Sequence, residues 1–173
     1  MKDLSMHLTD ILENAARAGA TRVAVDLARE GAEFVLQVRD NGPGLPPGVR
    51  ERPTDPFATT RTERPVGLGL ALLRMAAERT GGSLAVESPP GGGVTVRAAF
   101  HLDHLDAQPV GPLESALSSA LASWPGLDLD VLVNGRRVLD TAALRAELKD
   151  IDCSQPRIHN FLSALLRQEL AEV

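Results

Sequence analysis

The sequence predicts a two-layer α/β (α+β) sandwich, in which helices cover one face of a mixed sheet, with a small C-terminal α+β appendage. Two observations predict it. Over residues 3–101 the helical and strand patterns follow the order helix, strand, strand, long loop, helix, strand, strand. The strands of each pair have hairpin-length connections, so the sheet must be at least partly antiparallel, and both helices can cover one of its faces.

Each element of this first part has its own signal. Apolar residues recur at helical spacing in the helices, apolar and polar residues alternate in the strands, and glycines end both helices. The predicted helices are residues 3–18 and 68–80, and the predicted strands are residues 21–29, 33–40, 83–88 and 93–101. Residues 41–66 contain several Gly and Pro and indicate a long loop, a kind of segment that is often functional.

A break at residues 106–112 (DAQPVGP) divides the chain into a domain at 1–106 and a small α+β domain at 112–173. The second domain is predicted to contain a helix at 112–123, a hairpin at 128–139 that turns at Asn134-Gly135, and helical segments at about 141–148 and 156–170. A piece of roughly 60 residues is marginal for independent folding. We therefore expect it to pack on the first domain or on a partner, and its sequence carries no motif that indicates a role.

Composition and charge exclude several classes of protein. The net charge of −5, with acids and bases mixed along the chain, argues against general nucleic-acid binding, which needs a basic stripe. The single cysteine, Cys153, excludes an intrachain disulfide framework. No signal-peptide run opens the chain and no stretch approaches the ~18 apolar residues of a membrane span, so we expect a cytoplasmic protein without a membrane partner.

Polar residues at spacings of three and four lie on one arc of the first predicted helix: His7, Asp10, Asn14 and Arg17. A solvated helix face would account for them. Asn14 favours a function instead, because Asn is a poor mid-helix residue and caps nothing at this position, whereas its amide oxygen suits Mg²⁺. Arg17, one turn further on, is placed to meet phosphate oxygens.

Two glycine-containing segments are weak signals when each is taken alone. Residues 40–44 (DNGPG) are typical of a turn that ends a strand, but Asp40 fixed there would also suit an adenine amino group as a hydrogen-bond acceptor. Residues 67–70 (GLGL) open the second helix, and glycines ahead of a helix expose amide groups and the positive end of its dipole to an anion. The chain contains neither a Walker A sequence nor GxGxxG after a strand.

Together and in this order, these segments resemble the histidine-kinase-like (GHKL, Bergerat-fold) ATPase superfamily, which includes histidine kinases, anti-sigma serine kinases and the MutL, gyrase and Hsp90 ATPases. The resemblance covers about residues 4–101. It is carried by TDILENAARAGA (9–20), RDNGPGLP (39–46), TDPFATTR (54–61), VGLGLALLRMAAERTGG (66–82) and GGGVTVRAAF (91–100). It implies a stand-alone module that binds ATP with magnesium.

The resemblance implies a role for each matching residue at the phosphate end. Asn14 would ligate the Mg²⁺ that binds the ATP phosphates, and Asp10 holds the place of the carboxylate that orients or deprotonates the attacking water or hydroxyl. Asp10 is one methylene shorter than the Glu usual there. The other matches are Arg17 at a phosphate-touching position, Phe57 and Arg61 in the F box and ATP lid (54–66), and Gly67, Leu68, Gly69 and Leu70, whose amides meet the phosphates.

At the adenine end, Asp40 looks like the aspartate that reads the base, with Gly42 and Gly44 flanking it. Thr95 looks like the threonine on the last strand that supports Asp40 and a water at the adenine.

Three functions remain open. The module is a kinase that phosphorylates a separate protein, an ATPase whose hydrolysis or lid closure switches a complex, or a nucleotide sensor with negligible turnover. Asp10 favours catalysis. A phosphoacceptor hairpin is not expected, because the N-box helix begins so early, and His7 is expected on the helix surface or beside the phosphates. Residues 2–15 also resemble ATP-binding proteins associated with bacterial iron-hydrogenase systems, and the sequence leaves a homodimer open.

Overall fold

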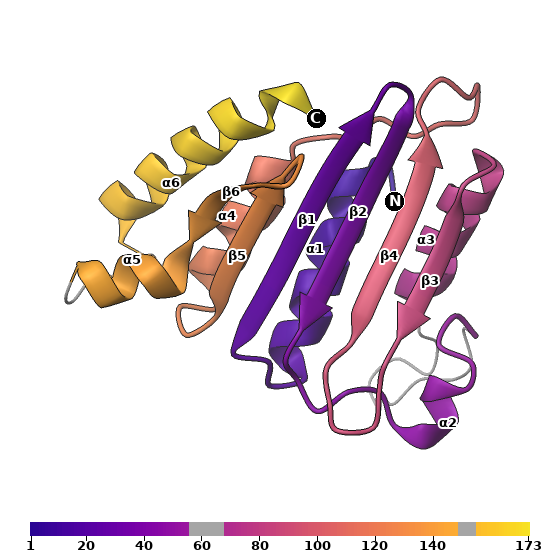
Figure 1. The fold of residues 1–173 in the computed structure, drawn as a ribbon, viewed down its shortest axis with the longest axis horizontal. Helices are drawn as coiled ribbons and strands as arrows, with labels where there is room; N and C mark the ends of the chain where they lie inside the picture. The colour runs from indigo at the N-terminus through magenta and orange to yellow at the C-terminus, as the bar shows by residue number, and fades with distance from the viewer. Residues whose placement is uncertain (56–67, 149–154) are drawn as a thin grey trace.

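Six strands form one mixed sheet in the computed structural model, which describes residues 1–55, 68–148 and 155–173 (Figure 1). The strands are β1 (Arg22–Glu30), β2 (Glu33–Asp40), β3 (Ser83–Glu87), β4 (Thr95–His101), β5 (Asp128–Val133) and β6 (Arg136–Asp140). Their order is β3-β4-β2-β1-β5-β6, and every neighbouring pair is antiparallel except β1 with β5. The predicted mixed sheet is confirmed.

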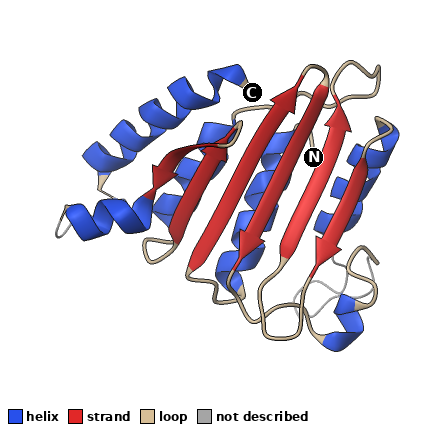
Figure 2. Ribbon diagram, in the orientation of Figure 1, coloured by secondary structure: helices blue, strands red, loops and turns tan. Residues whose placement is uncertain are grey.

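Helices α1 (Leu4–Arg17), α3 (Leu68–Arg79) and α4 (Leu113–Ser123) cover one face of this sheet (Figure 2). The other helices of the described residues are α2 (Pro47–Arg50), α5 (Thr141–Glu147), α6 (Pro156–Glu169) and the 3-10 helix η1 (Leu170–Glu172). Figure 2 shows α1, α3 and α4 behind the sheet, and α6 packs on α4 and β6. Within the described ranges the other face of β1, β2 and β4 is uncovered, so the predicted two-layer arrangement is confirmed.

Helix α1 has a well-defined start, end and apolar face. The Asp3 carboxylate caps its first turn by accepting a hydrogen bond from the backbone N–H of Met6 at 3.0 Å. The helix ends before Gly19, whose φ of +89° is the left-handed conformation that favours glycine after a helix. Its buried apolar residues are Leu4, Leu8, Ile11, Leu12 and Ala15. Asp10 and Asn14 lie beside this apolar face and are partly exposed.

The C-terminal segment joins the same sheet as the first part of the chain. Strand β5 pairs in parallel with β1, from Arg22 opposite Asp128 to Leu27 opposite Val133, and α4 packs on α1. The connecting loop is also bound, because the N–H groups at the start of α1 donate to carbonyls of residues 109 and 110 at 3.0 and 2.9 Å. The segment therefore packs on the first part, while the division at 106–112 stays a prediction about which parts fold alone.

Two local expectations have different outcomes. The hairpin turn at Asn134-Gly135 is confirmed, since both residues have positive φ, 49° and 77°, as a type I′ turn requires. The loop predicted at 41–66 contains, in its described part, the short helix α2 with Pro47 in its first turn.

No helix of the described ranges is long and apolar enough to cross a membrane.

The variant Leu117→Ala tests whether the two segments unfold together. Leu117 is fully buried in α4, which packs on α1 and α6, so its truncation should lower the free energy of unfolding by about 2–5 kcal/mol. Because both segments share one sheet, we expect a single denaturant transition that shifts as a whole. The control Leu105→Ala, at a side chain that is 99% exposed, should leave the midpoint unchanged. Two transitions of which only one moves would contradict the shared fold.

Candidate functional site

Helices α1 and α3 meet where the Asp10 carboxylate faces Gly69. A Cβ atom at Gly69 would come within 2.9 Å of Asp10 Cγ, closer than side-chain atoms pack, so a larger residue here would have to displace the Asp10 carboxylate. Asn14 Nδ2 donates a hydrogen bond to Asp10 Oδ2 at 3.1 Å. The structure thus brings together three of the predicted site residues, Asp10, Asn14 and Gly69, at the N-terminal turn of α3.

The start of α3 gives this meeting point its electrostatic character. The first N–H groups of a helix have no intrahelical partner, and the helix dipole adds a partial positive charge there. The Asp10 carboxylate lies against this turn, which favours a negative charge. Leu70 is partly buried against the hydrophobic core and anchors the turn, whereas Leu68 is half exposed. An anionic group would find backbone donors at the same place.

Arg17 lies at the last turn of α1, one turn beyond Asn14. Its Nη2 is 3.4 Å from a carboxylate oxygen of Glu13, and 61% of its side chain is exposed. An exposed pair of this kind contributes little stability. The Arg17 guanidinium is therefore easily redirected toward a stronger anion.

Asp40, the last residue of β2, points its side chain toward the helical layer. It pairs with Val23, which is fully buried on that face, and paired residues share a face of the sheet. Burial raises the pKa of the Asp40 carboxyl above its ordinary value, and hydrogen bonds from the backbone at Gly42 and Val94 oppose that rise. The Gly42 N–H donates to Asp40 Oδ1 at 2.8 Å, which fixes the carboxylate at the start of the 40–44 loop.

The turn between β3 and β4 closes over this loop, a contact that the sequence analysis missed. The Gly93 N–H donates to the Gly42 carbonyl at 2.6 Å, and a Cβ at Gly93 would lie 2.8 Å from the Asp40 carbonyl oxygen. Ser88 Oγ accepts from the Leu45 N–H at 2.8 Å, just after Gly44, and donates to the Gly93 carbonyl at 3.1 Å. The sequence of this connection, PPGGG (89–93), predicted only a hairpin-length link between the strands, although three consecutive glycines exceed what a turn needs.

Asn41 binds the loop after α1 to the loop after β2. Its Oδ1 accepts hydrogen bonds from the N–H groups of Thr21 and Arg22, both at 2.9 Å, and its Nδ2 donates to Thr21 Oγ1 at 2.9 Å. Asn41 therefore has a structural role: it holds the two loops together.

Thr95 does not lie with Asp40. In the β2–β4 ladder it pairs with Arg39, and successive residues of a strand point to opposite faces, so its side chain projects from the face opposite to that of Asp40. The neighbouring Val94 makes the contact instead, since its carbonyl accepts from the Asp40 N–H at 3.0 Å. A direct contact of the Thr95 side chain with Asp40, expected from the sequence, does not fit this register.

The remaining predictions concern His7 and the lid. His7 is 2% exposed, and its Nε2 lies 3.3 Å from Gln108 Oε1, so the expectation that it lies on the helix surface is wrong. Burial lowers the pKa of His7, which favours the neutral ring. The predicted site residues Phe57, Arg61 and Gly67 lie outside the described residues.

Residues 2–104 match the family described as "Histidine kinase-, DNA gyrase B-, and HSP90-like ATPase". The chain belongs to this ATPase family. The match ends just after β4, so β5, β6 and the helices α4 to α6 lie beyond it.

Relatives within this ATPase family include bacterial sensor proteins. The nitrogen regulation protein NtrY of Azorhizobium caulinodans is 36% identical over 116 residues, which is 61% of this chain and 15% of NtrY. The sensor protein KdpD of Escherichia coli is 41% identical over 98 residues, 54% of this chain and 11% of KdpD. The signal transduction histidine-protein kinase AfsQ2 of Streptomyces coelicolor is 37% identical over 94 residues, 52% of this chain and 18% of AfsQ2. The match spans less than a fifth of each relative.

The fold is also similar to a solved structure of the same superfamily. The ATPase domain of MutL from Aquifex aeolicus, complexed with ADP, superposes with a TM-score of 0.54 at 14% identity and covers 81% of this chain and 63% of that chain. Residues 2–104 are only 103 of the 173 residues, so the similarity of fold extends into the C-terminal segment. At this identity the comparison shows the fold alone.

A double-variant cycle tests the contact between Asp10 and Gly69. Gly→Ala inside a helix ordinarily stabilises by about 1 kcal/mol. Gly69→Ala should instead destabilise the protein, because its Cβ displaces the Asp10 carboxylate. In an Asp10→Ala background the same substitution should become neutral or stabilising, so the free energies of unfolding should deviate from additivity by at least about 0.5 kcal/mol. Gly48→Ala, where a Cβ would meet nothing within 4 Å, is the matched control. Additive effects would contradict the contact.

Proposed function

We propose that this chain binds ATP with Mg²⁺ between α1, the start of α3 and the 40–44 loop, and that it hydrolyses the nucleotide or transfers its γ-phosphate to a separate protein. The observation that carries the proposal is the Asp10–Asn14 pair held against Gly69 at the N-terminal turn of α3. Membership of an ATPase family supports it. So does the MutL domain of similar fold, which is complexed with ADP.

The adenine end of the proposed site is Asp40 with its loop. A carboxylate fixed by the Gly42 N–H and turned toward the helical layer is a suitable acceptor for the adenine amino group. The 40–44 loop and the 91–93 turn approach each other through backbone atoms, and we propose that a flat base lies beside this glycine-rich backbone. Gly42 and Gly44 therefore serve the adenine indirectly, through the shape of the loop.

The phosphate end combines α1 with the start of α3. The Asn14 amide turns its nitrogen to Asp10, so its oxygen, a hard ligand suited to Mg²⁺, is turned away from that carboxylate. Mg²⁺ at nucleotide sites binds through one or two protein ligands and the nucleotide phosphates, so a single amide oxygen beside the phosphates is a sufficient protein ligand for this proposal. When bound, Mg²⁺ neutralises charge on the phosphate oxygens.

The amides of residues 68–70 and the mobile charge of Arg17 would supply the remaining donors for the phosphates. Asp10 would orient the attacking water or hydroxyl and accept its proton. Its hydrogen bond from Asn14 and its place beside α3 hold the carboxylate in one orientation. We place this reaction in the cytoplasm, with a protein partner in trans.

Transfer to a separate protein is the first form of the proposal. Among the relatives of 36–41% identity, KdpD is named a sensor protein and AfsQ2 a signal transduction histidine-protein kinase. Hydrolysis that switches a complex is the second form, which the carboxylate at position 10 favours, because such a group can activate water as well as a hydroxyl. A sensor without turnover is the third outcome of the experiment.

Incubation of the purified chain with γ-labelled ATP and Mg²⁺, alone and with lysate of its own host, separates these forms. A labelled second protein supports transfer. Release of free phosphate by the chain alone supports hydrolysis. Binding without either product supports a sensor, and absence of ATP binding by calorimetry would reject the proposal. Light scattering of the same sample with and without ATP reports whether a homodimer forms.

Asp40→Asn should weaken ATP binding roughly ten- to a hundredfold, because it replaces a charged acceptor of a hydrogen bond worth about 1.5–3 kcal/mol. Calorimetry measures the dissociation constant. Burial raises the pKa of Asp40, so as the pH is lowered this carboxylate is protonated earlier than an ordinary Asp. The ATP affinity of the parent chain should therefore begin to fall at a higher pH than it would with an ordinary Asp. This pH dependence should vanish in Asp40→Asn. Asp26→Asn, on the same sheet but facing away from the helices, should bind ATP normally. Unchanged affinity in Asp40→Asn would refute the adenine assignment.

Asp10→Asn should keep ATP affinity within about threefold and lower turnover or transfer by roughly 10²–10⁴-fold, the usual contribution of a general base. Steady-state phosphate release and protein labelling measure this loss. Glu78→Gln, at a 52% exposed carboxylate that pairs with Arg74 near the C-terminal end of α3, is the control and should retain activity. Turnover at the parent rate in Asp10→Asn would show that Asp10 is not the catalytic carboxylate.

A further inference from the structure

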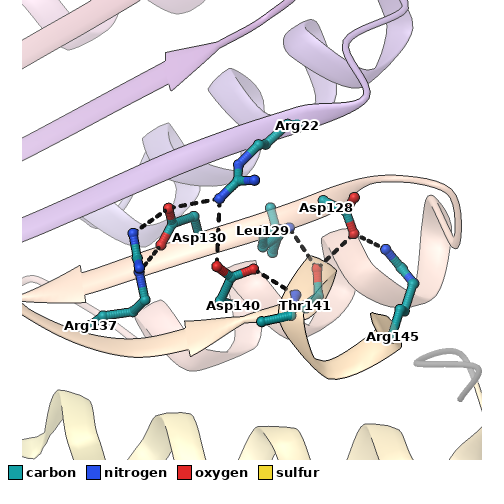
Figure 3. A network of polar contacts seen from close by, with 9 residues as sticks. Arg22, Asp128, Leu129, Asp130, Arg137, Asp140, Thr141 and Arg145 are labelled. Atoms are coloured by element: carbon teal, nitrogen blue, oxygen red, sulfur yellow. Dashed lines mark hydrogen bonds and ion pairs between the residues drawn. The ribbon is translucent and has the colours of Figure 1, made fainter. Parts of the chain in front are cut away.

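A cluster of acidic and basic side chains joins the C-terminal segment to β1 (Figure 3). At its centre is Asp130 of β5, whose side chain is only 9% exposed. Arg22 of β1 contacts it with Nη2 3.1 Å from Oδ2, and Arg137 of β6 contacts it with Nε 2.8 Å from Oδ1 and Nη2 3.1 Å from Oδ2. One carboxylate thus binds guanidinium groups from two different strands.

The rest of the cluster fixes the start of β5. Asp140 Oδ2 lies 3.6 Å from Arg22 Nη2, and Arg145 pairs with Asp128. Thr141, fully buried, accepts a hydrogen bond from the Leu129 N–H at 2.9 Å and donates to Asp128 Oδ1 at 3.2 Å. Three carboxylates face three guanidinium groups, so the cluster is neutral overall.

Arg22 also touches the proposed adenine loop through its backbone. Its N–H donates to Asn41 Oδ1 at 2.9 Å, and its carbonyl accepts from the Asn41 N–H at 3.1 Å. The preceding Thr21 accepts from the Asp128 N–H at 2.9 Å. The side chain of Arg22 therefore lies in the C-terminal cluster, while its backbone is hydrogen-bonded to Asn41, the residue that follows Asp40.

We propose that Asp130 is a positioning residue for adenine recognition: by holding the Arg22 side chain it fixes the backbone to which Asn41, and hence the 40–44 loop, is bound. The inference rests on the proposed function. It assigns to the segment beyond residue 104 a role in the nucleotide site, although that segment lies outside the family match.

The physical basis is that Asp130 is the nearer of the two carboxylates that hold the Arg22 guanidinium, at 3.1 Å against 3.6 Å for Asp140. In Asp130→Asn, Arg22 keeps only the longer ion pair, and its side chain, already 46% exposed, can turn toward solvent and no longer anchors its own backbone. In Arg22→Met the anchoring side chain itself is removed, while Asp130 stays paired with Arg137. Arg22 sits at the first pair of the β1–β5 ladder, where a shift reaches Asn41 through two hydrogen bonds. The effect falls on the adenine end. The phosphate end is built on α1 and α3, whereas the hydrogen bonds and ion pairs of the cluster lie on β1, β5, β6 and α5, so we expect the phosphate end to stay in place.

The test uses the full chain and two ligands. Calorimetry gives dissociation constants for ATP and for inorganic tripolyphosphate, each with Mg²⁺, in the parent, Asp130→Asn, Arg22→Met and the double variant. We expect the constant for ATP to rise about three- to tenfold in each single variant, in line with typical coupling energies, and the constant for tripolyphosphate to stay within twofold. The double variant should be no weaker than the weaker single variant. Arg22→Lys should restore part of the affinity.

Arg167→Met is the matched control, since Arg167 pairs with Glu114 at 3.5 Å between α6 and α4, on the helical layer of the same segment. It should leave both dissociation constants unchanged. Equal losses for ATP and tripolyphosphate, unchanged ATP affinity in both single variants, or additive losses in the double variant would each overturn the inference. If Asp130→Asn does not fold, Arg22→Met decides alone. A parent chain that binds no ATP rejects the proposed function itself, whereas a parent that binds ATP with unaffected variants rejects only the role of Asp130.

Discussion

Strand β1 is the constraint on which the other elements depend. It pairs antiparallel with β2 on one side and parallel with β5 on the other, so its register fixes both halves of the sheet. Val23, Val25 and Leu27 are fully buried against the helices. A shift by one residue would turn these side chains to the uncovered face and Ala24 and Asp26 into the core, which makes the register costly to change. Asp40 and Arg22 owe their positions to this strand.

The candidate site depends more on backbone proximity than on side-chain bulk. At one end Gly69 lets α3 approach Asp10, and at the other Gly93 lets the β3–β4 turn approach Asp40. In both places a carboxylate is fixed by an amide donor, Asn14 Nδ2 in the first case and the Gly42 N–H in the second. Two carboxylates held in this way on different elements can serve different chemistry, as the proposed phosphate end and the proposed adenine end require.

Local signals in the sequence predicted most of the fold. The helix expected at 3–18 is α1, Leu4–Arg17, because its caps and apolar spacing are local. The pairing of β5 with β1 has no such signal, since Asp128 and Arg22 are far apart in the sequence and a parallel ladder leaves no turn motif. The same reason explains Thr95: the pattern places it on the last strand, but only the register with Arg39 tells which face it occupies. The prediction that His7 lies on the helix surface was wrong because its partner, Gln108, is 101 residues away in the sequence and no local signal reveals the contact.

The pairing of β5 with β1 also makes the C-terminal segment an integral part of the sheet. Without it, β1 would be an edge strand with unpaired N–H and C=O groups and an apolar face exposed beside α1. With β5 paired to β1, the edge strand on this side of the sheet is β6. This strand is short, carries the exposed Arg136 and Arg137, and pairs irregularly with β5 near Val131. Arg137 then turns back to Asp130, so the charge that protects the edge also holds Arg22. Asp130 therefore links the edge strand β6 to Arg22 of β1, the residue whose backbone binds the proposed nucleotide loop.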